Sequence, residues 1–134
     1  MSFITKLSTL SFLVLAISFF STNNVTAQTT DSDVTIIELH QTPGEIGTQE
    51  LKLKPGKYQF RVVNDNVDHE VGFVIQNAKD ADGDVMETAL PNSFASKTIN
   101  AGEFAYTGVV NLTKGKYVYS CPLNPTPHYS IKVK

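Results

Sequence analysis

The sequence has one cysteine, no tryptophan and two methionines among its 134 residues. A single cysteine cannot form a disulfide within the chain, so a disulfide-stabilised fold is excluded. Lysine and arginine together number 11 against 13 aspartates and glutamates, and no basic cluster stands out. We therefore expect no nucleic acid partner, because such proteins concentrate positive charge on one face.

The longest apolar run lies at the N-terminus and has the features of a secretory signal peptide. Lys6 precedes an apolar stretch over residues 7–20, and Val25-Thr26-Ala27 places small residues where a signal peptidase cleaves. The stretch is too short for a stable membrane span, and it offers no cysteine for a lipid anchor. We expect residues 1–27 to be removed. Residues 28–134 then form one domain, periplasmic or secreted, with no membrane span.

Export makes the lone Cys121 informative, because cysteines in oxidising compartments are usually paired. An unpaired one is buried and inert, reactive, joined to another chain, or bound to a metal. Cys121 and His128 flank a loop that contains Pro122, Pro125 and Pro127. Proline fixes the backbone angle φ, so the loop is stiff enough to hold ligands in place.

A second imidazole, His69, lies far upstream in the sequence. Two imidazoles and one thiolate form the trigonal ligand set of a copper site that cycles between Cu(I) and Cu(II). We therefore predict a metal site of His69, Cys121 and His128 that holds one copper ion per chain. His40 is expected to be solvated or hydrogen-bonded instead.

The domain sequence consists of short stretches typical of strands, separated by turn residues. This pattern predicts an all-β sandwich of seven to eight strands. Asp84 is expected to cap one short helix near 84–90. A hairpin is predicted across residues 113–115, in which Gly115 supplies the positive φ that the turn needs. The predicted strands are Val34–Leu39, Leu51–Lys54, Lys57–Val63, Val71–Gln76, Phe104–Leu112, Lys116–Cys121 and His128–Val133.

Three stretches resemble the cupredoxins, which are small exported blue-copper proteins. Residues 64–75, with His69-Glu70 before Phe73-Val74-Ile75, are similar to the strand that carries that family's first histidine. Residues 98–103 resemble the turn before that family's last hairpin. Residues 114–121 resemble the strand that ends in its thiolate ligand. The resemblance implies a Greek-key β-sandwich with His69, Cys121 and His128 as copper ligands. It also implies a one-electron carrier that meets a redox partner protein.

The axial position departs from that family's pattern. Its usual methionine follows the second histidine, whereas Tyr129-Ser-Ile-Lys-Val-Lys134 contains none. We expect a three-coordinate site, or one completed by water or by a backbone carbonyl near Val67–Asp68. Met86 is expected to pack on an apolar face of the short helix. Asn124, or a group near Asn64, is expected to supply hydrogen bonds to the Cys121 sulfur, since the neighbouring prolines lack an N–H group.

Other functions stay open at this point. The chain could be a copper chaperone or storage protein that exchanges copper with a donor or acceptor, or a metal-free interaction module of the same fold. We expect no enzyme, because Cys121 and His128 have no evident third residue to orient them as nucleophile and base. The acidic turn at Asp80, Asp82 and Asp84 lacks the final glutamate of an EF-hand, which favours a solvated turn.

Overall fold

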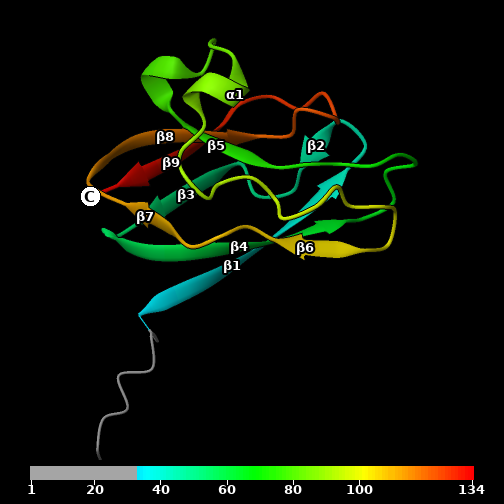
Figure 1. The fold of residues 1–134 in the computed structure, drawn as a ribbon, viewed down its shortest axis with the longest axis horizontal. Coiled ribbons are helices and arrows are strands. Elements are labelled where there is room, and N and C mark those ends of the chain that lie inside the picture. Colours follow the sequence, from blue (N-terminus) through cyan, green and yellow to red (C-terminus); the bar gives the residue numbers. More distant parts are fainter. Residues whose placement is uncertain (1–32) are drawn as a thin grey trace, which may run out of the picture.

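The computed structural model describes residues 33–134, which form two stacked β-sheets with one short helix (Figure 1). The predicted signal peptide, residues 1–27, lies outside the described residues. In the first sheet the strand order is β2-β1-β4-β6, and β7 also pairs with β4. Its strands are β1 (Val34–Thr42), β2 (Glu45–Ile46), β4 (Gly56–Asn64), β6 (Phe104–Tyr106) and β7 (Val110–Leu112).

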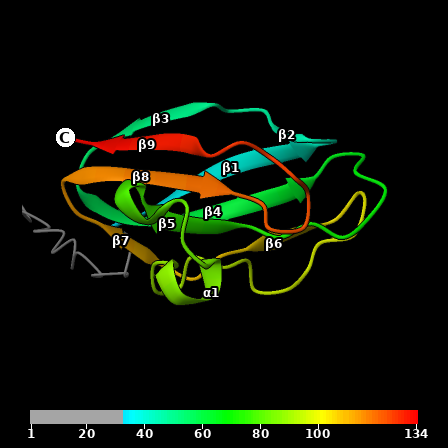
Figure 2. The ribbon, with the colours of Figure 1, turned by 90° about the horizontal axis from the view of Figure 1, so that it is seen from above.

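The second sheet has the order β3-β9-β8-β5 and lies over the first (Figure 2). Strands β1 and β4 run parallel, as do β3 and β9, and the other pairs are antiparallel. The all-β sandwich expected from the sequence is confirmed, with nine strands across residues 33–134 rather than seven or eight. The strands of the second sheet are β3 (Glu50–Leu53), β5 (Val74–Asn77), β8 (Gly115–Ser120) and β9 (Tyr129–Val133).

The short helix forms where it was predicted. Helix α1 (Val85–Thr88) follows a single 3-10 turn, η1 (Ala78–Asp80). The Asp84 carboxylate accepts a hydrogen bond of 2.8 Å from the Met86 N–H group, which is the expected N-terminal cap. Within the described range, no helix has the length and apolar character needed to cross a membrane.

The hairpin predicted across residues 113–115 is wrong. Strand β7 pairs with β4 in the first sheet, while β8 pairs with β5 and β9 in the second. The turn therefore carries the chain from one sheet to the other. Burial explains the crossing, because Leu112 at the end of β7 and Tyr117 in β8 both pack into the core between the sheets.

One predicted strand, Phe104–Leu112, divides into β6 and β7. The break falls at Thr107, whose side-chain oxygen accepts a hydrogen bond of 3.0 Å from the Phe60 N–H group of β4. This hydroxyl takes the place of a backbone acceptor in the ladder, and it donates in turn to the Gly108 carbonyl at 2.7 Å. A side chain that competes for backbone partners interrupts regular pairing.

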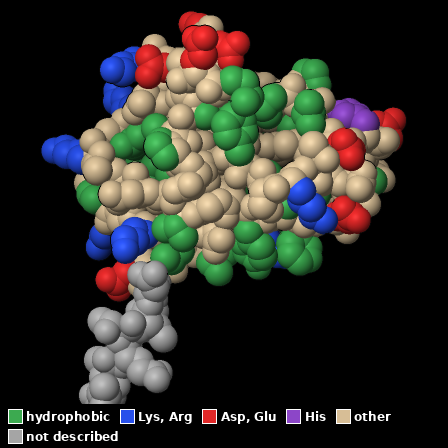
Figure 3. Space-filling view, viewed as in Figure 1, with side chains coloured by type: hydrophobic (Ala, Val, Ile, Leu, Met, Phe, Trp, Pro, Cys, Tyr) green, Lys and Arg blue, Asp and Glu red, His purple; other side chains and the backbone are tan. Residues whose placement is uncertain are grey.

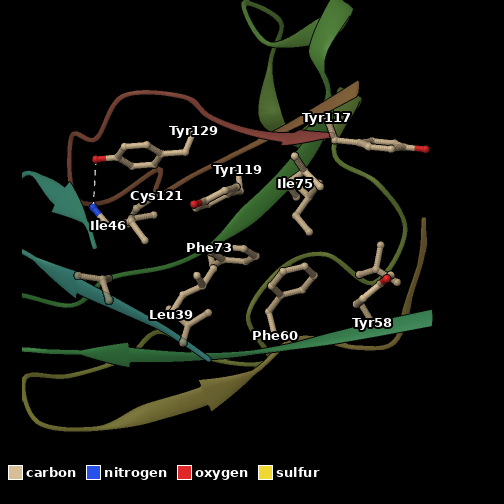
Figure 4. Packing of buried hydrophobic residues seen from close by; sticks show 14 of the residues in the cluster. Leu39, Ile46, Tyr58, Phe60, Phe73, Ile75, Tyr117, Tyr119, Cys121 and Tyr129 are labelled. Carbon is tan, nitrogen blue, oxygen red and sulfur yellow. Dashed lines mark hydrogen bonds between the residues drawn. The ribbon is translucent and has the colours of Figure 1, made fainter. Parts of the chain in front are cut away.

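A row of aromatic rings fills the space between the sheets (Figure 4). Ring centroids lie 5.4 Å apart for Phe60 and Phe73, and 5.9 Å apart for Phe73 and Tyr119. The row continues to Tyr129, 5.5 Å from Tyr119. Burial raises the pKa of the Tyr119 hydroxyl, which stays protonated and donates to the Thr48 carbonyl.

Candidate metal centre

Cys121 lies at the end of the aromatic row, directly after strand β8. Only 5% of its surface is exposed, and it is the free cysteine of the chain. Figure 4 shows it between Ile46 and Tyr119 at one end of the core. The Tyr129 hydroxyl accepts a hydrogen bond from the Ile46 N–H group at 3.1 Å, so strand β2 is held against this end of the sandwich.

Two backbone N–H groups donate hydrogen bonds to the Cys121 sulfur. The Gly72 nitrogen lies 3.2 Å from Sγ, and the Asn124 nitrogen lies 3.1 Å from it. The predicted contribution of Asn124 is confirmed, and the second donor is Gly72 rather than a group at Asn64. The sulfur is thus oriented by two different segments. Hydrogen bonds of this kind around a cysteine sulfur tune the redox potential of copper–thiolate sites.

The loop from Cys121 to His128 is fixed at several points. The Cys121 N–H group donates to the Thr126 hydroxyl at 3.1 Å, which closes the first part of the loop. The buried side chain of Asn124 donates to the Thr42 carbonyl and accepts from the Gly44 N–H group, both at 3.0 Å. Asn124 therefore ties the loop from Cys121 to His128 to the turn between β1 and β2.

His69 lies on the loop between β4 and β5, and buried Asn64 holds that loop in place. The Asn64 amide donates to the carbonyls of His69 and Ile99, at 3.0 and 2.9 Å. Its oxygen accepts from the Val67 N–H group at 2.9 Å. Asn64 thus positions the backbone of His69, and not the Cys121 sulfur.

The His69 ring reaches the Cys121 loop. Its Nε2 atom lies 3.1 Å from the Leu123 carbonyl oxygen, and Nδ1 lies 3.0 Å from the Asp68 carboxylate. Half of the His69 side chain is exposed. Both ring nitrogens therefore face oxygen acceptors of the protein, and one must leave its acceptor before it can bind a metal.

His128 is exposed at the other end of the same loop, immediately before β9. Across residues 33–134, no three histidine, cysteine, aspartate or glutamate side chains form a group that could hold a metal ion. The structure thus brings His69 to the Cys121 loop, but it does not assemble the three candidate ligands around one point. His40, expected to be hydrogen-bonded, lies 2.8 Å from the Glu38 carboxylate.

Gln41 is a buried residue that is linked to the Cys121 sulfur through Gly72. The sequence motifs did not single it out. Its side-chain nitrogen donates to the Gly72 carbonyl at 2.6 Å. The only signal for it in the sequence is a polar residue two positions after Leu39, on the core-facing side of β1. No sequence signal marks Gly72, because it contributes a backbone N–H group.

An apolar groove lies beside the Cys121 loop. Met86, Phe94, Pro122 and Leu123 are among its lining residues, and Figure 3 shows hydrophobic side chains gathered on this face near α1. Met86 is 76% exposed, so the expectation that it packs against the protein is wrong. Helix α1 spans a single turn and buries none of its residues, which leaves no covered face for Met86.

Neither a protein-family model nor a curated protein sequence matches the chain. Solved structures do match. Auracyanin A, a "blue" copper protein from the green thermophilic photosynthetic bacterium Chloroflexus aurantiacus, aligns with a TM-score of 0.60 at 14% identity, covering 75% of this chain and 99% of that one. Auracyanin B aligns with a TM-score of 0.57 at 18% identity, covering 74% and 88%. The fold is cupredoxin-like.

A dithionite-reduced auracyanin from the photosynthetic bacterium Roseiflexus castenholzii gives the same result, with a TM-score of 0.54 at 15% identity over 75% of this chain and 97% of that one. The cupredoxin-like fold makes copper the metal to test against these residues. The donor types fit copper, because a buried thiol and two imidazoles are present at one end of the sandwich. The three side chains are not arranged as a metal-binding site, since the ring nitrogens of His69 face the Leu123 carbonyl and the Asp68 carboxylate.

Proposed function

We propose that this protein is an exported one-electron carrier that binds one copper ion through Cys121, His69 and His128. The observation that supports this most strongly is the environment of Cys121. Its buried sulfur is oriented by the N–H groups of Gly72 and Asn124, although the chain offers no second cysteine to pair with it. A bound copper ion would supply the exchange of one electron between Cu(I) and Cu(II).

The residues of the chain have separate tasks in this proposal. Gly72 and Asn124 fix the sulfur from two sides, so that its position changes little when charge at the site changes. Asn64 holds the backbone of His69, while the exposed ring can turn from the Leu123 carbonyl. His128, on the exposed side of the loop, would provide the second imidazole. A rigid backbone with two adjustable rings keeps the ligand set close to its working geometry.

A redox partner is expected to dock at the Cys121 end of the molecule. Pro125 and Tyr129 lie in or beside the Cys121–His128 loop and are candidate apolar contacts by position, but Tyr129 is buried. The exposed apolar side chains near this loop are instead those of Leu123, Met86 and Phe94. Transient redox complexes use small interfaces, which a groove of this kind can provide.

The test is a copper titration of residues 28–134 followed by visible absorption. We expect a thiolate-to-Cu(II) charge-transfer band that saturates at one equivalent, and we expect Cys121→Ser to abolish it. The fold should survive this change, because serine keeps nearly the same volume at the position. Absence of a band in the unaltered protein, with no copper retained after gel filtration, contradicts the proposal.

One observation favours a different function, that of a metal-free interaction module. Both nitrogens of His69 already face protein acceptors, the Leu123 carbonyl and the Asp68 carboxylate, so the ring has a structural role without a metal. The same titration separates the two functions. For a metal-free module, His69→Ala would destabilise the loop, and copper would bind neither the variant nor the unaltered protein.

A further inference from the structure

Six of the eleven lysine and arginine residues lie together at one end of the second sheet. They come from three segments that are far apart in the sequence, so no run of basic residues marks them. Strands β3, β9 and β8 bring these segments side by side (Figure 2). The group, called the lysine patch below, consists of Lys52, Lys54, Lys114, Lys116, Lys132 and Lys134.

The register of the three strands lines up the first row of the lysine patch. Lys132 of β9 lies directly opposite Lys52 of β3 on one side and Lys116 of β8 on the other. Ile131 and Val133, the neighbours of Lys132 in β9, are buried, so the row lies on the outer face of the sheet. Like charges directly opposite one another destabilise a sheet. The row thus lowers the stability of the fold unless an anionic partner offsets its charge.

A second row, formed by Lys54, Lys134 and Lys114, continues the first beyond the paired ends of the three strands. The Lys134 N–H group donates to the Leu53 carbonyl at 3.1 Å, which keeps the ends of β9 and β3 together. All three lysines of this row are exposed. Between the two rows, Val133 and the aliphatic stems of neighbouring lysines line an open hollow that is mostly apolar.

One carboxylate among residues 33–134 forms ion pairs with the lysine patch. Glu50 of β3 lies 3.5 Å from the Lys52 ammonium and 3.2 Å from the Lys132 ammonium. The hydrogen bond from Lys132 is the main cause that holds the pKa of the Glu50 carboxyl below its ordinary value. The other four lysines have no ion-pair partner in the described part of the chain. The patch therefore keeps most of its positive charge, although the whole chain has a net charge of −2.

The lysine patch and the candidate metal centre lie at opposite ends of strand β8. Lys116 is near the start of this strand and Cys121 follows its last residue, roughly 16 Å away at the rise of a strand. Figure 3 shows Lys and Arg side chains at the end that carries the C-terminus and a histidine at the far end. Strand β1 also starts at the patch end, where Val34 pairs with Lys57. The segment expected to direct export thus joins the fold on this side.

We propose that the lysine patch binds an anionic lipid bilayer and turns the Cys121 end away from it. A flat array of ammonium groups suits a flat surface of phosphate groups, because each ammonium is a point charge without a fixed fork of donors. Protein interfaces are depleted in lysine, and the patch has no aromatic ring on which nucleic acid bases could stack. The patch shares no residue with the candidate metal centre, so the inference is independent of copper.

The test is sedimentation of residues 28–134 with vesicles of phosphatidylcholine, with and without phosphatidylglycerol. We expect binding only when phosphatidylglycerol is present, and weaker binding as salt is added. Lys116→Gln with Lys134→Gln should weaken it roughly 30-fold, about five-fold for each lysine. The matched control, Arg61→Gln with Lys97→Gln, removes two charges that are paired with carboxylates outside the patch and should bind as the unaltered protein does. Equal binding to both kinds of vesicle, or equal loss in both double variants, would overturn the inference.

Acetylation of the unaltered protein covers the case in which a variant does not fold. With phosphatidylglycerol vesicles, the amines of the lysine patch should react more slowly with acetic anhydride than they do with phosphatidylcholine vesicles, while the rate at Lys97 should not change. Unchanged rates at the patch would show that the inference is wrong. It is also wrong if the protein ignores both kinds of vesicle and binds a soluble polyanion such as heparin. None of these outcomes depends on copper, so the inference and the proposed function can fail separately.

Discussion

Replacing Phe73 by alanine is expected to lower the free energy of unfolding by about 3–5 kcal/mol. Phe73 is 1% exposed, and its ring packs against Phe60 of the first sheet and Tyr119 of the second. Its removal therefore opens a cavity between the sheets and breaks the aromatic row at its centre. A domain of this size has a total stability of about 5–15 kcal/mol, so the loss is a large part of it.

Urea denaturation followed by far-ultraviolet circular dichroism measures this loss. Phe104→Ala is the matched control, because the ring is 45% exposed and contacts the Arg61 guanidinium, 3.9 Å from the ring centroid, and the Tyr106 ring, 5.9 Å away. We expect that change to cost about 1 kcal/mol or less. A Phe73→Ala variant that is no less stable than Phe104→Ala contradicts the position of this ring at the centre of the core.

Replacing Asn64 by alanine should have the second largest effect, on both stability and metal binding. The buried Asn64 side chain makes hydrogen bonds to His69, Val67 and Ile99. At about 1 kcal/mol for each bond, we expect a loss of roughly 3 kcal/mol. Because the His69 loop is then released, copper affinity should also fall by roughly 10- to 100-fold.

The same titration and denaturation experiments check the Asn64 prediction. Asn111→Ala is a suitable control, since Asn111 is exposed in strand β7 and should change stability by about 0.5 kcal/mol or less. If Asn64→Ala is destabilised and still binds copper as tightly as the unaltered protein, then the His69 loop is not part of the metal site.

Much of the fold could be predicted because burial alternates along the strands. Alternation along the predicted strand Lys57–Val63 places Tyr58, Phe60 and Val62 on one face, and all three are buried in β4. The Asp84 cap was also predictable, since capping depends on a few neighbouring residues. Where local sequence decides a structure, as in these cases, the prediction is confirmed.

The pairing of strands was less accessible, because it depends on residues far apart in the sequence. The turn at residues 113–115 fits a hairpin locally, yet the strands before and after it belong to different sheets. The first strand was predicted to end at Leu39, whereas β1 continues to Thr42 and then pairs with β2. Local patterns show that a turn forms, but they do not show which partner the next strand finds.

The residues of the candidate site also differ in whether local sequence could predict them. Cys121 and Asn124 could be chosen from the sequence because they share one distinctive loop. Gly72 and Gln41 could not, since one contributes a backbone N–H group and the other comes from the first strand of the fold. The ligand roles of His69, Cys121 and His128 stay predictions, because no three such side chains among residues 33–134 form a group that could hold a metal ion.

The most direct test of the copper proposal is the metal content of the protein purified from its native host without chelators. We expect about one copper ion per chain, together with a visible charge-transfer band that disappears on reduction and returns on oxidation. Protein that is folded and carries no metal, or carries another metal in place of copper, would contradict the account.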